Sequence, residues 1–163
     1  METTWLATDF GVFQLTASPE GLRSVRLTDI EVPANLPIPQ NEHLNHAVHQ
    51  LEEYFRGERE AFELTLDWSG ATDFYRQVWT ELEKIPYGRT TSYLAIAEKL
   101  GDKNAIRAVG QANKRNPIAI IVPCHRVIAK NGDLQGYFYG IDFKRRLLAL
   151  ENPRSFGEQA SLF

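Results

Sequence analysis

The apolar residues of the chain follow two different spacings, and the change between them limits the folds that the sequence allows. Three short β-favouring runs come first, at residues 3–7, 11–17 and 22–27, with the turn signal SPEG at residues 18–21. These runs predict a small antiparallel meander. From residue 41 onward most apolar residues recur in steps of three and four, which is typical of helices that bury one face. The sequence therefore predicts an α+β protein with a small sheet first and helices after it.

The stretch WSGATD at residues 68–73 has the composition of a linker and divides the chain. We therefore expect an N-terminal α/β domain at residues 1–70 and a mainly helical C-terminal domain at residues 71–152. A tail at residues 153–163 follows them.

Helical spacing and turn residues locate the elements inside each domain. The first domain should contain a helix at residues 41–56 and a further strand in which Phe62, Leu64 and Leu66 alternate. A short turn at residues 101–102 joins two helices of the second domain, an arrangement that has the form of a helix-turn-helix. The helices expected there run from Phe74 to before Pro86, from a cap at Thr90 or Thr91 to Leu100, from Asn104 to Arg115 and from Phe143 to Glu151.

Charge is distributed unevenly along the chain. The net charge is -3, but residues 1–85 carry 6 basic and 15 acidic side chains, whereas residues 86–150 carry 11 basic and 4 acidic ones. A basic half fits a polyanionic substrate such as nucleic acid, and it also fits an ordinary solvated surface. No apolar run approaches the length of a membrane span, and the start METTWLATDF lacks the basic and apolar blocks of a secretory signal. We therefore expect a cytoplasmic protein without a membrane partner.

Cys124 is the only cysteine, which excludes an internal disulfide and a cysteine metal cage. Cys124 is therefore either a buried packing residue or a reactive nucleophile. Pro123 restricts the backbone, so we expect a strand-like run at residues 120–122 to end in a bend that presents the sulfur. His125 supplies a base and Arg126 a fixed positive charge. Because adjacent side chains diverge, a water between Cys124 and His125 is the expected proton path.

The helix expected at residues 104–115 is unusual for its small side chains, with Arg107 among them. Small residues let a backbone approach a phosphate ladder or the floor of a groove, and they serve equally for tight helix packing. The small residues are Ala105, Ala108, Gly110 and Ala112.

Three histidines, His43, His46 and His49, recur on the first expected helix. Their spacing spreads them over about 240° of the helix surface at roughly 100° per residue, so we expect a solvated face and no metal site.

The run Pro123-Cys124-His125-Arg126-Val127, with its flanks, resembles the O6-alkylguanine-DNA alkyltransferases. The likeness extends from Phe74 to Glu151, and the part before it is similar to the family's less constrained N-terminal domain, which has a ribonuclease H-like fold. The resemblance implies a monomeric suicide DNA repair protein without cofactor or metal. It would bind duplex DNA through the helix-turn-helix, turn an O6-alkylated guanine out of the stack and keep the alkyl group on its own cysteine. The flanks that match are Arg107 to Gly110, Asn116-Pro117, Gly136-Tyr137 and Lys144 to Glu151.

The resemblance also implies a role for each matching residue. Cys124 would accept the alkyl group, His125 would act as its water-linked base, Glu151 would orient the imidazole, and Tyr93 would protonate the leaving guanine at N3. Arg107 would fill the place of the flipped nucleotide. The remaining candidates are Ala108, Gly110, Lys114 and Arg115 on the DNA, Val127, Tyr137, Phe138 and Tyr139 around the pocket, and Asn116 and Pro123 as structural residues of the active-site turn.

The chain departs from the family after Gly136-Tyr137, where a small residue and two glycines are usual. Phe138 and Tyr139 stand there instead. If they face the pocket, they leave little room for a large alkyl group, which predicts good transfer of methyl and weak transfer of benzyl.

The last residues, QASLF, resemble the short peptide with which bacterial replication and repair proteins bind the sliding clamp. In that pattern Gln159 would be the anchor, and Leu162 and Phe163 would enter an apolar pocket. A frayed tail and a tail that packs on its own domain are the alternatives.

Two other functions fit the same residues. A thiol hydrolase could use Cys124, His125 and Glu151, but it would release product repeatedly. A sensor that binds alkylated DNA without repairing it is the third hypothesis, and Cys124 weighs against it because sensors of this type usually lack that cysteine.

Overall fold

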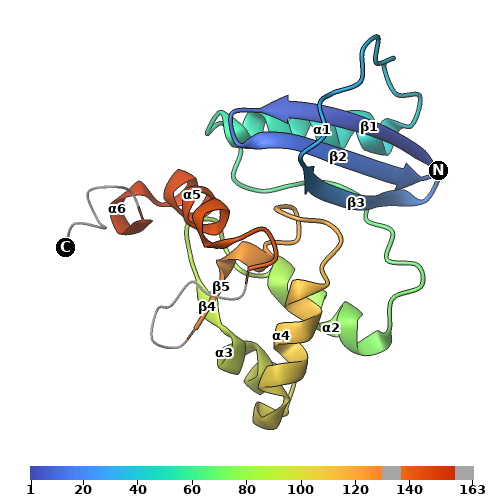
Figure 1. Cartoon of the computed structure of the whole chain (residues 1–163). Helices are drawn as coiled ribbons and strands as arrows, with labels where there is room; N and C mark the ends of the chain where they lie inside the picture. Colours follow the sequence, from blue (N-terminus) through green and yellow to red (C-terminus); the bar gives the residue numbers. More distant parts are fainter. Residues whose placement is uncertain (130–136, 157–163) are drawn as a thin grey trace. The chain divides into compact units, whose positions relative to one another are not determined.

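A computed structural model of the chain describes residues 1–129 and 137–156 (Figure 1). Its contacts divide the chain into two units. The first contains Met1–Ser69 together with Pro117–Ala119, and the second contains Gly70–Asn116 and the chain from Ile120 onward.

The first unit is built on an antiparallel sheet of three strands in the order β1 (Glu2–Thr8), β2 (Gly11–Ser18) and β3 (Gly21–Thr28). The predicted meander is confirmed. The alternation of the strands turns apolar side chains such as Phe13 to one face, and α1 (Glu42–Phe55) lies along the sheet in Figure 1. The fully buried side chains from these elements include Phe13, Leu15, Leu22 and Val25 of the sheet and Leu44, Leu51 and Tyr54 of the helix.

The outer edge of β3 receives a second segment of chain. The backbone N–H of Val25 donates to the carbonyl of Pro117 at 3.0 Å, and Ala119 donates back to the carbonyl of Val25 at 3.1 Å. Val25 and Ile118 thereby form a parallel bridge. These bonds explain why Pro117–Ala119 belongs to the first unit although it lies far along the chain.

The strand predicted at Phe62, Leu64 and Leu66 is wrong. Only Leu66 forms an isolated bridge, with Leu22. The side chain of Gln50 on α1 instead forms two hydrogen bonds with the backbone of Glu63. Its amide nitrogen donates to the carbonyl of Glu63 at 3.1 Å, and its amide oxygen accepts from the N–H of Glu63 at 2.9 Å. A side chain that satisfies these groups takes the place of a neighbouring strand.

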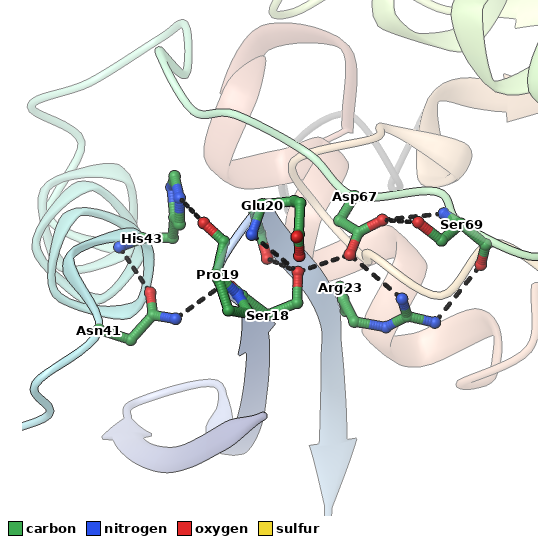
Figure 2. A network of polar contacts seen from close by, with 9 residues as sticks. Ser18, Pro19, Glu20, Arg23, Asn41, His43, Asp67 and Ser69 are labelled. Carbon is green, nitrogen blue, oxygen red and sulfur yellow. Dashed lines mark hydrogen bonds and ion pairs between the residues drawn. The ribbon is translucent and has the colours of Figure 1, made fainter.

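Asp67 closes the first unit through a network of polar contacts that Figure 2 shows. Its Oδ2 accepts from the Ser18 hydroxyl at 2.5 Å and from Arg23 at 3.1 Å, and its Oδ1 accepts from the backbone and the hydroxyl of Ser69. The hydrogen bonds from Ser18 and Ser69 are the main cause that holds the pKa of Asp67 well below its usual range. The end of the first unit is therefore fixed by a buried carboxylate that stays ionised.

The histidines of α1 have separate surroundings. His43 donates from its ring to the carbonyl of Pro19 at 3.2 Å, while His49 lies 3.6 Å from Glu53. Asn41 caps the helix by accepting from the backbone N–H of His43 at 2.8 Å, and its amide donates to the carbonyl of Ser18 (Figure 2).

The second unit is mainly helical, as predicted. Its elements are α2 (Asp73–Glu83), β4 (Thr91–Ser92), α3 (Tyr93–Lys99), the 3₁₀ turn η1 (Lys103–Ala105), α4 (Ile106–Lys114), the 3₁₀ turn η2 (Cys124–Arg126), β5 (Val127–Ile128), α5 (Ile141–Glu151) and α6 (Pro153–Phe156). The indole of Trp79 on α2 donates to the carbonyl of Ala112 at 2.8 Å and ties α2 to α4. Within residues 1–129 and 137–156 no helix is long and apolar enough to cross a membrane.

The cap predicted at Thr90 or Thr91 is corrected by one position. Ser92 caps α3 by accepting from the N–H of Ala95 at 3.0 Å. Thr91 and Ser92 form β4, which pairs in parallel with Val127 and Ile128 of β5. This pairing joins the start of α3 to the chain that directly follows the cysteine turn.

Candidate active site

The cysteine turn begins with an unusual backbone. Ile120 has φ of 72°, in the left-handed region that a β-branched residue rarely adopts, and it is buried. The run at residues 120–122 is therefore a turn and not the predicted strand. After Pro123 the chain enters η2, where the N–H of Cys124 bonds back to the carbonyl of Val122 at 2.8 Å. Such strain persists only where the surrounding structure fixes it, and it lies four residues before the sulfur.

Asn116 connects the two ends of this turn. Its amide nitrogen donates to the carbonyl of Val122 at 2.8 Å and lies 3.2 Å from Sγ of Cys124. The side chain therefore fixes the backbone before the cysteine and contacts the sulfur itself.

The sulfur of Cys124 is nearly enclosed, with 5% of the residue exposed. Burial raises the pKa of the thiol, while the hydrogen bond from Asn116, the charge of Lys144 and the hydroxyl of Tyr137 act in the opposite direction. Because burial prevails, the thiol is protonated at rest and has to lose its proton when it reacts.

His125 and Glu151 form a buried pair beside the cysteine. The imidazole Nε2 lies 2.6 Å from Oε2 of Glu151, and neither side chain is more than 1% exposed. Arg126 donates to both oxygens of the same carboxylate, at 2.8 and 3.1 Å, and to the carbonyl of Ile85 at 2.7 Å. Arg126, which was expected to supply positive charge near the sulfur, therefore pairs with Glu151 instead.

Protonation states follow from these contacts. Burial acts to raise the pKa of Glu151, but its hydrogen bonds with His125 and Arg126 and the charge of Arg126 outweigh it and hold that pKa well below the usual range. Burial lowers the pKa of His125 despite its bond to Glu151. The imidazole is thus neutral and donates from Nε2, which leaves Nδ1 as an acceptor. Nδ1 is buried and has no hydrogen-bond partner among the residues that the structure describes.

Tyr93 begins α3 and belongs to the same site. Burial raises the pKa of its phenol, and the sulfur of Cys124 is the second cause. Asn113 on α4 acts to lower the pKa of that phenol, and its amide nitrogen donates to the carbonyl of Cys124 at 3.4 Å.

Lys144 is the buried cation of the site. Three basic residues follow one another near the start of α5, and of these Lys144 is fully buried whereas Arg145 and Arg146 are exposed. Its ammonium donates to the carbonyl of Val127 at 2.6 Å and lies 5.8 Å from the ring centre of Tyr137. The chain thus has a fixed positive charge near the thiol.

The DNA-binding candidates lie on α4 and just after it. Arg107, Ala108, Lys114 and Arg115 are exposed, and Gly110 is half-buried. A Cβ added to Gly110 would meet nothing within 4 Å, so internal packing does not require a glycine there.

The pocket candidates divide into two groups. Val127 and Tyr137 are buried, whereas Phe138 is 65% exposed and contacts Tyr139 edge to face at 5.0 Å. Tyr139 lies edge to face with Tyr137 at 5.8 Å. Gln159, Leu162 and Phe163 lie outside the described residues.

Sequence reasoning missed two residues of this site, Asn113 and Lys144. For Lys144 the signal was present, because Phe143, Lys144 and Leu147 repeat on the buried stripe of a helix. Asn113 is adjacent to the buried Ala112 and three residues before Asn116, and no pattern in the sequence alone separates it from a surface asparagine.

Comparison with known proteins agrees with this geometry. Residues 1–68 match the 6-O-methylguanine DNA methyltransferase ribonuclease-like domain, and residues 73–153 match the 6-O-methylguanine DNA methyltransferase DNA binding domain. A methylated-DNA–protein-cysteine methyltransferase of Methanosarcina acetivorans is 48% identical over 145 residues, which cover 86% of this chain and 92% of that protein.

Solved structures show the same relationship. The O6-methylguanine methyltransferase of Mycobacterium tuberculosis has 40% sequence identity and a TM-score of 0.81, with 99% of both chains covered. A structure of the same relative in complex with DNA matches with a TM-score of 0.83 over the whole of both chains. The predicted fold class and the family resemblance are both confirmed. The chain belongs to the 6-O-methylguanine DNA methyltransferase family, and it acts in DNA repair as a methylated-DNA–protein-cysteine methyltransferase.

Proposed function

We propose that Cys124 takes the methyl group of O6-methylguanine in duplex DNA and keeps it, so that each molecule acts once. The observation that carries this assignment is the buried series in which Glu151 accepts from Nε2 of His125, while Nδ1 has no hydrogen-bond partner among the residues that the structure describes. A neutral imidazole oriented in this way can accept the proton of a neighbouring thiol, directly or through one water.

The reaction is a displacement at the methyl carbon. Nδ1 of His125 takes the thiol proton, the sulfur of Cys124 forms a bond to the carbon, and the bond between carbon and O6 breaks. The electron pair of that bond goes to the purine. Tyr93 gives its phenolic proton to N3, so guanine leaves neutral, and the imidazolium proton later returns to the phenolate through solvent. The carboxylate of Glu151 stabilises the imidazolium that forms in the first step.

DNA would be held by α4. The exposed Arg107 has the planar charged group needed to fill the place of a flipped nucleotide, and Gly110 leaves room for close approach of a backbone or groove floor. Lys114 and Arg115 add exposed positive charge where the helix ends. The solved complex of the M. tuberculosis relative with DNA supports a nucleic-acid partner.

Preference for methyl over benzyl groups remains a prediction. It rests mainly on Tyr139, whose ring lies against that of the buried Tyr137, since Phe138 is largely exposed. Comparable rates for both groups would refute it.

A second proposed partner is the sliding clamp, through Gln159, Leu162 and Phe163. Removing residues 159–163 should abolish clamp binding and leave transfer on a short duplex unchanged. Equal clamp affinity before and after the deletion would refute the docking proposal.

The test of the main proposal uses equal amounts of protein and a duplex with one O6-methylguanine. Peptide mass spectrometry should find one methyl group per molecule on Cys124, and Cys124→Ser should transfer none. Repair of several lesions by one molecule, or methylation at another residue, would overturn the assignment.

A further inference from the structure

The loop between α2 and β4 packs against the end of α5, and the proposed reaction assigns it no role. Arg89 donates from its backbone N–H to the carbonyl of Pro86 at 3.1 Å, so the chain turns over residues 86–89. Gly88 is the third residue of this turn and has φ of 77°, a conformation that favours glycine. A Cβ on Gly88 would also lie 3.2 Å from the backbone carbonyl oxygen of Glu151. The turn is therefore shaped for close approach to the end of α5.

Gly88 is held on both sides by two consecutive residues, Glu151 and Asn152. Its N–H donates to Oε1 of Glu151 at 3.4 Å, and its carbonyl accepts from Nδ2 of Asn152 at 3.0 Å. The orientation of the Asn152 amide is fixed at both ends, because Oδ1 accepts from the N–H of Ser155 at 3.2 Å and only Nδ2 can donate to a carbonyl. Gly88 therefore adds a further donor to the carboxylate of the site.

Two other residues of the loop, Ile85 and Tyr87, hold Arg126, which is a partner of the same carboxylate. Nη1 of Arg126 donates to the carbonyl of Ile85 at 2.7 Å. Cζ of Arg126 lies 5.8 Å from the ring centre of Tyr87, within the roughly 6 Å over which an aromatic face attracts a cation. The hydroxyl of Tyr87 donates to the carbonyl of Leu150 at 3.4 Å. A planar guanidinium held by a carbonyl and a ring presents Nε and Nη2 to Glu151 in one orientation.

We infer that residues 85–88 form a positioning loop, which holds Glu151 in the orientation that stabilises the imidazolium of His125, and that Tyr87 is the side chain through which the loop acts. The inference rests on the proposed function, because the loop affects the rate only if Glu151 acts on His125 during transfer. Oε2 of Glu151 lies 2.6 Å from Nε2 of His125 and 3.1 Å from Nη2 of Arg126, so one oxygen serves both cations. A guanidinium that moves therefore shifts the oxygen on which the imidazolium depends, and small misplacements of such groups lower a rate.

The experiment measures the single-turnover transfer rate with protein in excess over a saturating duplex that carries O6-methylguanine. Tyr87→Leu removes the aromatic face and should slow transfer by about 3- to 30-fold, the rate equivalent of a partly buried cation–π contact. Tyr87→Phe keeps that face and should stay within about twofold of the parent, because it loses only the long hydrogen bond of the hydroxyl. Affinity for an unmodified duplex should not change in either variant, since the proposed DNA contacts lie on α4.

A double-mutant cycle separates positioning from a general loss of structure. In the Glu151→Gln background, Tyr87→Leu should change the rate by less than about twofold, because the carboxylate on which the loop acts is absent. The matched control is Tyr75→Leu, which removes another half-buried tyrosine of the second unit, one whose ring lies against Trp79 on α2. It should leave the transfer rate of the parent unchanged.

Asn152→Ser tests the same loop from the side of α5. Serine retains an oxygen that can accept from the N–H of Ser155, but its shorter side chain lacks the amide donor that holds Gly88. This variant should slow transfer by about 2- to 10-fold in the parent and by less than about twofold in the Glu151→Gln background. If Tyr87→Leu melts below the assay temperature, Asn152→Ser decides by this criterion.

Three results would overturn the inference while transfer to Cys124 by the parent still supports the proposed function. They are equal slowing by Tyr87→Leu in both backgrounds, slowing by Tyr87→Phe as large as that by Tyr87→Leu, and a parent rate that neither Tyr87→Leu nor Asn152→Ser lowers. Absence of transfer by the parent would overturn the proposed function itself.

Discussion

Glu151 has two buried partners, Arg126 and His125, and its substitution should affect both the stability of the fold and the rate of methyl transfer. Glu151→Gln keeps the shape of the side chain but removes the charge that both His125 and Arg126 contact. Arg126 is 6% exposed, so its guanidinium would lose its counter-ion in a site that water hardly reaches. Breaking one partner of a buried ion pair costs about 3–5 kcal/mol of folding free energy. That cost is a large share of the roughly 5–15 kcal/mol that a domain of ordinary stability possesses.

The chemical effect is separate from the folding effect. The carboxylate stabilises the imidazolium that forms when His125 takes the thiol proton, and hydrogen bonds to charged groups contribute about 1.5–3 kcal/mol. At 1.36 kcal/mol per factor of ten, Glu151→Gln should slow methyl transfer by about 10- to 150-fold. Denaturant unfolding measures the first quantity, and single-turnover transfer at 25 °C measures the second.

The matched variant is Glu151→Gln combined with Arg126→Met, in which no unpaired charge remains. It should recover part of the lost stability, because a buried pair can be replaced by apolar groups at small cost, but none of the lost rate. Glu98→Gln, on the exposed side of α3, is the control and should change neither. Full recovery of the rate by the double variant, or a transfer rate in Glu151→Gln within threefold of the parent, would refute the reasoning.

Three further predictions concern other parts of the chain. Asp67→Asn should destabilise the first unit by about 2–3 kcal/mol in denaturant unfolding at pH 7. Because the folded pKa of Asp67 is lowered, its contribution is present above the unfolded carboxyl pKa of about 3.9 and is lost as the pH falls, so parent and variant should converge in acid; a constant difference would contradict this. Gly110→Ala should stabilise α4 by about 0.5–1 kcal/mol in thermal unfolding and yet weaken DNA binding in a titration, whereas unchanged affinity would exclude close approach at this position. Transfer rate should be flat from pH 8 to about 6.5 and fall only below that, because burial lowers the pKa of His125; a rate that climbs tenfold per pH unit up to pH 9 would indicate a thiolate formed without the imidazole.

The sequence predicted most elements because their apolar spacing reports burial directly. The meander, α1 and the helices of the second unit all lie within a few residues of their predicted bounds. The errors at Glu63 and at the start of α3 share one physical origin, which is that hydrogen-bond partners from elsewhere in the chain satisfied the backbone. Gln50 holds Glu63 in place of a strand, and the pairing of β4 with β5 shifts the cap of α3 to Ser92.

Within the site, sequence proximity indicated that Cys124 and His125 act together, and the family resemblance brought in Glu151 and Tyr93. Sequence could not show that Arg126 turns from the sulfur to the carboxylate, since that choice depends on the carbonyl of Ile85, which is 41 residues away. The buried position of Asn113 likewise depends on how α3 and α4 pack, which no local pattern records.

The bridge between Val25 and Ile118 restricts how this protein can be divided. A fragment that starts at Gly70 would contain every residue of the cysteine turn, yet Pro117 and Ala119 would lose the backbone partner that Val25 supplies. Two main-chain groups next to Asn116 would then be solvated or unpaired, and the left-handed Ile120 would be anchored from one side only. The reactivity of Cys124 should therefore be measured in the intact chain and not in a fragment that starts at Gly70. If the two parts are expressed separately, both have to be present while the cysteine turn folds.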